Sequence, residues 1–568
     1  MMNGMGLSFC FGASGAGKST YLQKLAVSRE EENILFVVPD QYTMQTQKEL
    51  VEASPSHGIM NIDVLSFGRL AHRVFEETGA DPRAVLDDIG KSLLLRRIAE
   101  KKKDELRVLS GSIGRLGMIA EIKSVISEFM QYDVALERVA VLEKFAGEHG
   151  QGALTARLAD LRLLYESFLE EKKARFITSE ETMDLLAEAI PSSALIAKST
   201  IIFDGFTGFT PVQNRVLSEL MRCAREVIVS LTISEDGGLT PQEAEKMKTA
   251  GPEEALFYLT RKTVKDLTAL AARAGAPRRR DVYAVMPEEV HRSPALEHLE
   301  RQLFRHPAHP YHGKKEEKPA IELIEASTIE EEVRQVFRTI RLLSLKEGYA
   351  YRDFAVVTGD PESYNDEIEK QAMRFHIPVY VDRTRGILQN PLTESIRSAL
   401  NIINEAYSYE SIFHYLRSGM SDLKQETVDR LENYVLANGI RGRRKWGLPI
   451  GESDELEAAR KRFLEEIAPL EKDERPGTAA VRTERLYSFL TGIDAQEKLE
   501  NYARGFAEEG DPVREMEYSQ IYREILSLLD QIHDLIGDEK ISAEDFVRLL
   551  DTGFQEIRLG TLDRKRHV

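Results

Sequence analysis

The chain has 568 residues, enough for about four domains at roughly 150 residues each. It carries 76 Lys and Arg against 94 Asp and Glu, and the net charge of −18 excludes a nucleic-acid binder that works through a global positive field. The only two cysteines, Cys10 and Cys223, are too few for a disulfide framework or for a four-thiolate zinc or iron–sulfur site within this chain.

The sequence carries no sign of export or membrane insertion. Residues 1–6 contain no basic segment followed by a long apolar run, so no signal peptide is expected. No stretch reaches roughly eighteen consecutive apolar residues, so neither a membrane span nor a membrane partner is expected. We therefore expect a cytoplasmic location.

The first part of the chain alternates between strand and helix patterns. Apolar runs predict strands at 7–11, 34–38 and 62–65, each followed by helical periodicity. After a nearly all-helical stretch, strands return at 200–203 and 227–231. The pattern predicts a parallel α/β domain at 1–86 plus 197–304, interrupted by a helical insertion at 87–196.

The remainder of the chain repeats this organisation. Residues 305–320 combine prolines with a mixed charge run, which is typical of a linker. A second α/β domain is expected to begin over 321–400, with helices at 330–343 and around Ile368 and strands at 354–358 and 379–381. Residues 401–568 are again helical, which predicts a second insertion.

Residues 12–19, Gly-Ala-Ser-Gly-Ala-Gly-Lys-Ser, match the phosphate-binding loop pattern. Its glycines let backbone N–H groups face phosphate oxygens, Lys18 supplies a charge for the β- and γ-phosphates, and Ser19 can ligate Mg²⁺. The strand before the loop and the helix after it favour an anion site at the helix N-terminus. We expect ATP with Mg²⁺, held by Gly12, Gly15, Gly17, Lys18, Ser19 and Thr20.

Asp204, which ends the strand at 200–203, is the expected magnesium partner of Ser19. Capping of the next turn is the alternative role for this aspartate. Active helicases and many ATPases place a glutamate directly after this aspartate, where it polarises the attacking water. The next residue here is Gly205, so no catalytic residue is assigned, and ATP binding is better supported than hydrolysis.

Side chains suited to nucleic acid follow two further strands. Gln41 comes after the strand at 34–38, and Phe67 and Arg69 come after the strand at 62–65. The carboxyl ends of parallel strands face the ligand crevice, where Gln and Arg can pair with base edges and Phe can stack on a base. Helix capping by Asp40 and Ser66, with Phe67 in the core, is the equally supported alternative.

Two basic clusters stand out in this acidic chain. Residues 441–445, Arg-Gly-Arg-Arg-Lys, precede the only tryptophan, Trp446. Charge beside an aromatic ring suits a nucleic-acid strand, and a charged loop is an equally good interpretation. The cluster Arg278 to Arg280 follows a proline and is expected to lie in a solvated turn.

Several segments together resemble the AddB-type (RexB-like) component of ATP-dependent helicase/deoxyribonuclease. The resemblance rests on residues 11–20, 37–41, 64–67 and 203–211, and further along on 332–336, 351–356 and 431–440. It covers nearly the whole chain and implies a superfamily-1 helicase-like body of two RecA-like α/β domains, each with a helical insertion. This combination is much more specific than the phosphate loop alone.

The resemblance also implies partners and a task. The family pairs with an AddA-type motor and nuclease subunit as a heterodimer, and it processes DNA ends for recombinational repair. The AddB-type component scans the 3′-ended single strand for the regulatory sequence Chi. The scanning residues of the family fall on Gln41, Thr43, Phe67, Arg69 and Phe209. His72 stands where the family usually has a bulky aromatic residue, so weaker stacking is expected there.

Family members continue into a C-terminal nuclease domain with four cysteines for an iron–sulfur cluster. Neither cysteine of this chain suits that cluster, so we expect an N-terminal portion that does not cleave DNA alone. Enzyme activity is then expected of the complex. An active superfamily-1 ATP-driven DNA translocase and a non-catalytic P-loop scaffold for a partner motor are the two alternatives.

Overall fold

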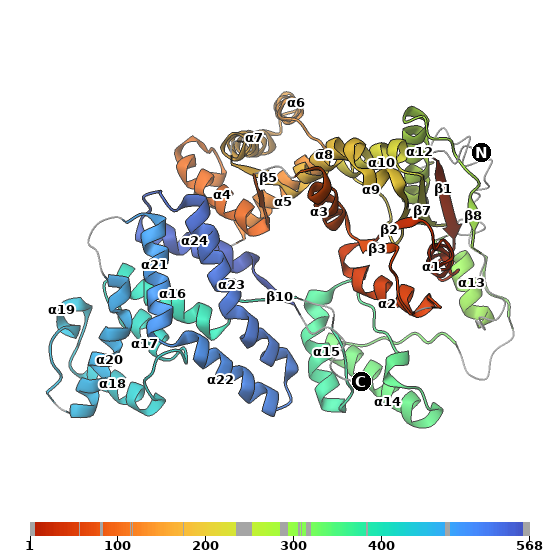
Figure 1. Ribbon diagram of the computed structural model, residues 1–568. Coiled ribbons are helices and arrows are strands. Elements are labelled where there is room, and N and C mark those ends of the chain that lie inside the picture. Colours follow the sequence, from red (N-terminus) through yellow and green to blue (C-terminus); the bar gives the residue numbers. More distant parts are fainter. Residues whose placement is uncertain are drawn as a thin grey trace. The chain divides into compact units, whose positions relative to one another are not determined.

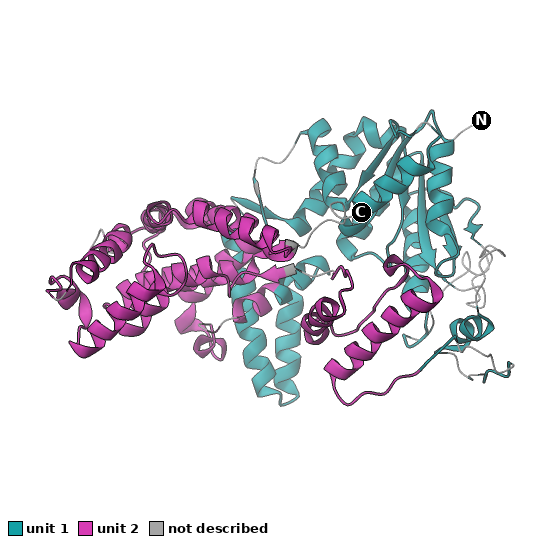
Figure 2. Cartoon of the chain, turned by 90° about the horizontal axis from the view of Figure 1, so that it is seen from below, with its two compact units in different colours: residues 1–87, 124–322 teal, residues 88–123, 323–568 magenta. Residues whose placement is uncertain are grey.

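The computed structural model (Figure 1) describes residues 6–55, 57–79, 83–113, 115, 117–173, 175–233, 251, 253–284, 293–304, 307, 309–313, 320–381, 384–451, 453–471 and 477–560. The chain divides into two compact units (Figure 2): unit 1 comprises Met1–Asp87 and Ser124–Glu322, and unit 2 comprises Asp88–Lys123 and Leu323–Val568. None of the helices among the described residues combines the length and apolar character that a membrane crossing requires.

Unit 1 contains a six-stranded parallel sheet in the order β3-β2-β6-β7-β1-β8. Its strands are β1 (Leu7–Gly12), β2 (Asn33–Val37), β3 (Ile62–Leu65), β6 (Ser199–Phe203), β7 (Glu226–Thr232) and β8 (Val282–Tyr283). The five strands expected in this region are confirmed. The two-residue strand β8 is too short to leave a periodic pattern in the sequence.

Helices cover both faces of this sheet. On one face lie α1 (Lys18–Ser28) and α2 (Thr43–Ala53), which pack around Cys10; on the other lie α3 (Phe67–Thr78), α8 (Ser179–Ala189), α10 (Pro211–Cys223) and α12 (Tyr258–Arg273), which pack around Phe9 and Phe11. The inner strands β1, β2, β6 and β7 carry buried apolar residues on both faces, as expected for a parallel sheet covered on both sides.

A buried ion pair fixes β1 beside β8. The Arg278 guanidinium pairs with Asp281 at 2.7 Å and lies over the Phe9 ring at 4.7 Å, and Asp281 also accepts a hydrogen bond from the Phe9 N–H. The Arg278 side chain is 9% exposed. The solvated turn predicted at 278–280 is therefore wrong for Arg278, because a carboxylate three residues later accompanies it into the interior.

The helical stretch expected at 87–196 is shared between the two units. Unit 1 holds α6 (Leu136–Glu148), α7 (Gly152–Lys172), α9 (Ala194–Lys198) and the parallel pair of strands β4 (Ala84–Leu86) and β5 (Phe176–Thr178). Further along the chain it also holds α13 (Pro294–Gln302), and α5 (Met118–Gln131) runs across the division between the units. Unit 2 takes α4 (Asp88–Lys101), where Ser92 Oγ donates a hydrogen bond to Glu556 at 2.9 Å. The expected domain boundaries stay a prediction.

Unit 2 is mainly helical (Figure 1). Besides α4 it contains α14 (Ile329–Glu347), α15 (Pro361–Phe375), α16 (Pro391–Asn404), α17 (Tyr409–Leu416), α18 (Gln425–Ala437), α19 (Gly442–Trp446), α20 (Asp454–Glu471), α21 (Ala479–Gly492), α22 (Ala495–Glu508), α23 (Pro512–Ile536) and α24 (Ala543–Glu556), with β9 (Thr384–Gly386) antiparallel to β10 (Arg558–Gly560). Short 3₁₀ turns are η1 (Asp40–Tyr42), η2 (Lys103–Glu105), η3 (Leu109–Gly111), η4 (Ile190–Ser192) and η6 (Tyr351–Asp353).

The start of the expected second α/β domain is only partly as predicted. Helices α14 and α15 occupy the predicted positions and share a small apolar core that includes Val333, Phe337 and Ile368. No strand forms at 354–358 or 379–381 in the described part of the chain, and Val357 is 93% exposed. A strand needs a neighbour that pairs its N–H and C=O groups, which an apolar run alone does not supply. The second RecA-like domain therefore stays a prediction. Within the expected linker, 305–306, 308 and 314–319 lie outside the described residues.

Candidate functional site

The loop between β1 and α1 has the shape of an anion cradle. Gly15 and Gly17 have φ angles of 77° and 81°, a left-handed backbone that residues with a Cβ rarely adopt. A Cβ on Gly12 would lie 2.8 Å from the Ala284 carbonyl oxygen, so this position also requires glycine. Backbone in such turns directs successive N–H groups toward one point, and the N-terminus of α1 follows at once. This geometry suits a phosphate group.

Lys18 lies at the mouth of this cradle. Its ammonium donates hydrogen bonds to the carbonyl oxygens of Gly12 at 3.1 Å and Ala13 at 2.8 Å. Burial lowers the pKa of Lys18, and the negative charge of Asp204 opposes that shift. The ammonium is therefore held over the loop, close enough to Asp204 for their charges to interact.

Asp204 is buried at the carboxyl end of β6, 7% exposed. Its carboxylate accepts a hydrogen bond from Ser230 Oγ on β7, the strand that lies between β6 and β1. Its N–H donates to the Val37 carbonyl at 3.0 Å. Ser230 was missed in the sequence, although a hydroxyl inside the apolar run 227–231 was a signal that a polar partner faces that strand.

Cys10, on β1 beneath the loop, is fully buried. Burial, reinforced by the charge of Asp204, raises the pKa of its thiol to about 11, and the positive charge of Lys18 opposes the shift. The thiol is thus protonated at neutral pH and cannot serve as a nucleophile.

Gly205 follows Asp204 with a φ of 81°. A Cβ there would lie 3.4 Å from Pro39 Cδ and 3.6 Å from Tyr42 Cδ2, which are ordinary contacts. Space is therefore available, and the left-handed backbone alone disfavours any other residue. The glutamate used by hydrolytic relatives of this loop is absent, and the local backbone is unsuited to it.

The residues at this edge of the sheet fit MgATP. Hydroxyl and carboxylate oxygens are the ligands that Mg²⁺ prefers, and Ser19 is exposed in the first turn of α1 while Asp204 follows β6. Thr20 is also exposed in that turn. Within the described ranges no group of three or more His, Cys, Asp or Glu residues could hold a metal alone.

The candidate DNA-binding residues follow three strands that are neighbours in the sheet, β3, β2 and β6. Gln41 in η1 and Arg69 in the first turn of α3 are exposed. His72 is exposed one turn further along α3 and lies 3.4 Å from Glu76. Phe209 follows β6, with its ring centroid 6.3 Å from that of Phe67. The fold thus brings these positions to one edge of the sheet.

Two of these side chains, Phe67 and Thr43, are buried and make contacts within the protein. Phe67 is 8% exposed and packs in a cluster of four rings with Phe203, Phe206 and Phe209. Thr43 is 5% exposed, and its hydroxyl donates to the Asp40 carbonyl at 2.9 Å. The core role that the sequence left open for Phe67 is confirmed, and Ser66 caps α3 by accepting a hydrogen bond from the Arg69 N–H at 3.4 Å. The expected capping by Asp40 is wrong, because neither η1 nor α2 has a side-chain cap. Contact of Phe67 or Thr43 with DNA stays a prediction.

Residues 9–300 match the family described as ADDB, N-terminal. The chain is similar to the B-type component of ATP-dependent helicase/deoxyribonuclease from Lachnoclostridium phytofermentans, at 35% identity over 98% of this chain and 49% of that relative. It is similar to proteins of the same name from Clostridium novyi (30%; 98% and 49%) and Desulforudis audaxviator (31%; 98% and 50%). The chain spans about half the length of these curated relatives. The matched region contains the phosphate cradle, Asp204 and the strand ends around them. Since it covers more than half of the chain, the chain belongs to the AddB family.

Proposed function

We propose that this chain is the ATP-binding and DNA-binding subunit of an AddAB-type helicase/nuclease that processes DNA double-strand breaks for homologous recombination. The observation that carries the proposal is the cradle at Gly15 and Gly17, which opens beside Lys18 and Asp204. The relatives are named as subunits of a helicase/deoxyribonuclease, which supports assembly with a partner subunit. We propose that this partner is an AddA-type motor.

In this proposal the chain binds MgATP and does not turn it over rapidly. Backbone N–H groups of the loop bind the phosphates, Lys18 compensates their charge, and Ser19 and Asp204 hold Mg²⁺. The ion neutralises phosphate charge when it is bound. Ser230 keeps the Asp204 carboxylate in place. With glycine at 205, no side chain is present there to activate water, so bound ATP acts as a conformational ligand.

The second part of the proposal is that the same edge of the sheet reads the 3′-ended strand. Gln41 and Arg69 are exposed there and carry groups that form paired hydrogen bonds with base edges. Thr43, Phe67, His72 and Phe209 complete the proposed set. Since Phe67 and Thr43 are buried, we assign sequence response chiefly to the two exposed polar side chains.

The nucleotide site is tested by Lys18→Ala, with Lys24→Ala as the matched control on the exposed side of α1. A charged hydrogen bond contributes about 1.5–3 kcal/mol, so Lys18→Ala should weaken binding of a fluorescent ATP analogue with Mg²⁺ by about 10- to 100-fold. Equal affinities of the two variants would refute the assigned site.

The scanning role is tested in the assembled complex with Gln41→Ala and Arg69→Ala. Arg73→Ala is the control, because Arg73 lies on the same helix and pairs with Asp63 and Glu76. The two test variants should lose the response to the regulatory DNA sequence and keep processing of other DNA. A normal response by both variants would overturn scanning by these residues.

A non-catalytic P-loop scaffold is the second candidate, favoured by the burial of Phe67 and Thr43. A scaffold predicts that Lys18→Ala and Arg69→Ala leave both DNA processing and sequence response intact while assembly persists. An active translocase instead predicts robust DNA-stimulated ATP turnover that Lys18→Ala abolishes.

A further inference from the structure

The basic cluster at residues 441–445 forms an exposed knob in unit 2. Arg441, Arg443, Arg444 and Lys445 are all exposed on and beside the short helix α19. Gly442, with a φ of 76°, lets the chain turn sharply into this helix. Four cations therefore lie within five consecutive residues of a chain whose net charge is −18.

Carboxylates neutralise only part of this knob. Arg443 pairs with Glu471 at 3.0 Å, and Lys445 donates to the Gly439 carbonyl at 2.6 Å. Across the described part of the chain, the guanidinium groups of Arg441 and Arg444 make no side-chain hydrogen bond or ion pair. Two positive charges are thus left for a ligand.

In the basic cluster at 278–280, by contrast, most cations are paired with carboxylates. Arg278 is buried against Asp281 and Phe9, and Arg279 lies 3.5 Å from Glu226. Two of its three cations are thus held by carboxylates of unit 1, and Arg280 is the one that is exposed. The cluster at 441–445 is not accounted for in this way.

Trp446, which directly follows the knob, anchors it in the core of unit 2. Trp446 is 2% exposed, packs edge-on against Phe463 with centroids 5.0 Å apart, and accepts a hydrogen bond from Arg460 at 2.8 Å through its carbonyl oxygen. Because its ring is buried, Trp446 cannot stack on a base. The aromatic part of the interpretation made from the sequence is therefore wrong, and only the charges face solvent.

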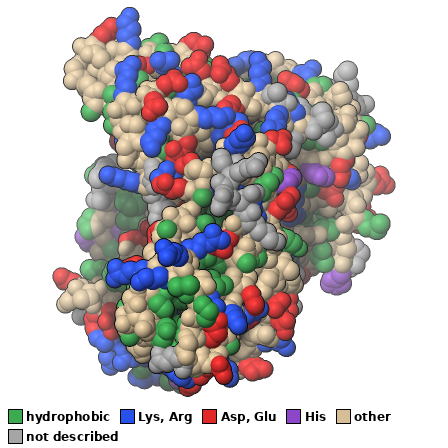
Figure 3. Space-filling model, turned by 90° about the vertical axis from the view of Figure 1, so that its left-hand side faces the viewer, with side chains coloured by type: hydrophobic (Ala, Val, Ile, Leu, Met, Phe, Trp, Pro, Cys, Tyr) green, Lys and Arg blue, Asp and Glu red, His purple; other side chains and the backbone are tan. Residues whose placement is uncertain are grey.

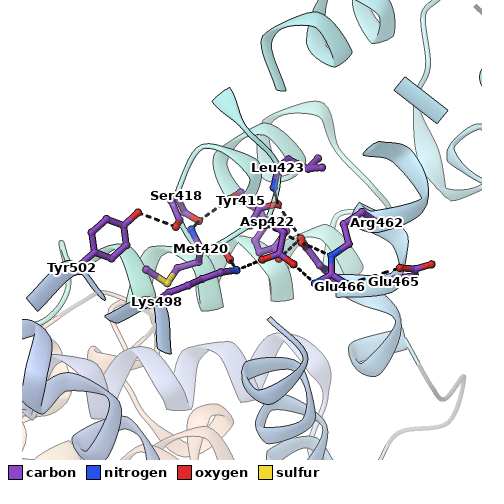
Figure 4. Close-up of polar contacts among 12 residues, drawn as sticks. Tyr415, Ser418, Met420, Asp422, Leu423, Arg462, Glu465, Glu466, Lys498 and Tyr502 are labelled. Carbon is purple, nitrogen blue, oxygen red and sulfur yellow. Dashed lines mark hydrogen bonds and ion pairs between the residues drawn. The ribbon is translucent and has the colours of Figure 1, made fainter. Parts of the chain in front are cut away.

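The helix beneath Trp446, α20, is fixed by a buried polar network (Figure 4). Glu466, whose side chain is fully buried, accepts hydrogen bonds from Tyr415 at 2.7 Å and from Ser421 and the Asp422 N–H at 3.0 Å each. Arg462, one turn before it, pairs with Asp422. A network this well satisfied fixes α20, against which the backbone of α19 is anchored through Trp446.

From these observations we propose that the knob at 441–445 binds the phosphate backbone of DNA, independently of base sequence. The proposal rests on the DNA-binding function proposed above and assigns it a second contact, in unit 2. Guanidinium groups bind phosphate through paired hydrogen bonds, and two of them here have no protein partner. Figure 3 shows the side of the molecule that is at the left of Figure 1, where α19 lies. Lys and Arg side chains gather on this side.

The spacing of the cations suits a nucleic-acid strand. Four residues along a helix advance by about 6 Å, and phosphates of one strand advance by about 3.4 Å each along the duplex axis. The knob therefore spans about two phosphates. Since the ring of Trp446 is buried, the contact should depend on salt and be indifferent to sequence.

The test uses the full chain and fluorescence anisotropy with a labelled duplex and a labelled single strand over a series of NaCl concentrations. Arg441→Ala/Arg444→Ala is compared with Arg430→Ala/Lys461→Ala, which removes the same charge from unit 2 at positions already paired with Glu455 and Glu457. Loss of two phosphate contacts should reduce the slope of log affinity against log salt by about 1.8 for the duplex. The affinity at low salt should fall at least about tenfold, equally for all DNA sequences.

Three results would overturn the proposal: a salt slope equal to that of the control, absence of DNA binding by the unmodified chain at low salt, or displacement of DNA by polyglutamate at equal charge concentration. The last result would identify an acidic protein as the ligand. Failure of the scanning role proposed for Gln41 and Arg69 is separate, because it changes sequence response and leaves this salt slope unaltered.

Discussion

The sharpest test of a nucleotide site that binds without turnover is substitution at Gly205. This residue has a φ of 81°, where a residue with a Cβ costs about 1–2 kcal/mol. The nearest atoms to an added Cβ are Pro39 Cδ at 3.4 Å and Tyr42 Cδ2 at 3.6 Å, so no overpacking adds to that cost. Gly205→Ala should therefore lower the melting temperature by about 2–8 °C for a unit of this size.

Gly205→Glu restores the residue type that activates water in hydrolytic relatives, but it places that residue on a strained backbone. We expect the same destabilisation as for Gly205→Ala and no gain in ATP turnover with single-stranded DNA. Gly205→Asn should be less destabilised than Gly205→Ala, because asparagine tolerates the left-handed conformation. Thermal unfolding and steady-state phosphate release measure the two effects on the same samples.

Two results would contradict a constrained, non-hydrolytic position at Gly205. If Gly205→Ala unfolds at the temperature of the unmodified chain, the backbone at this position is not constrained as the geometry requires. If Gly205→Glu raises DNA-stimulated turnover at least about tenfold over Gly205→Ala, the missing glutamate was the only obstacle to hydrolysis, and the chain is a motor lacking one residue.

Two further predictions concern the same edge of the sheet. Ser230→Ala removes the hydroxyl that holds Asp204, so Mg²⁺-dependent ATP affinity should fall several-fold in a binding titration. The control is Ser8→Ala, which removes a strand hydroxyl bonded to Glu226 and should leave the affinity unchanged. Equal effects of the two substitutions would contradict the role of Ser230. Because burial raises the pKa of Cys10 to about 11, only about one thiol in a thousand is ionised at pH 8, and iodoacetamide should label Cys10 in the folded protein far more slowly than Cys223, with a rate that rises as the pH approaches 11. Peptide mass mapping checks this, and equal labelling of the two cysteines would exclude a buried, protonated Cys10.

The first sheet and its phosphate loop were predictable because their signals are local. Each strand is a run of apolar residues, and the loop places two glycines and a lysine within four residues of one another. The partners that complete the site are not local. Ser230 lies 26 residues from Asp204, and the pair meets only because β7 lies beside β6. A pattern along the chain does not contain that adjacency.

The same distinction explains the strands that did not form. Residues 354–358 have the apolar run of a strand, yet Val357 is 93% exposed, while α14 and α15 formed where helical periodicity placed them. A helix satisfies its N–H and C=O groups within itself, whereas a strand depends on a neighbour. The helices of unit 2 are therefore more predictable from the sequence than its strands.

The acidic composition does not exclude DNA binding at a local group of cations. A net charge of −18 rules out attraction of DNA by the whole molecule, but it does not rule out attraction by a few residues that the structure keeps apart from carboxylates. In the cluster at 278–280 the cations of Arg278 and Arg279 meet Asp281 and Glu226 inside unit 1, while at 441–445 Arg441 and Arg444 keep their charge at the surface. Arg280 alone is exposed in the first cluster, whereas all four cations of the second are exposed, so two clusters that look alike in sequence differ in how much charge remains for a ligand. Charge after pairing, and not charge by composition, decides where an acidic protein can hold a nucleic acid.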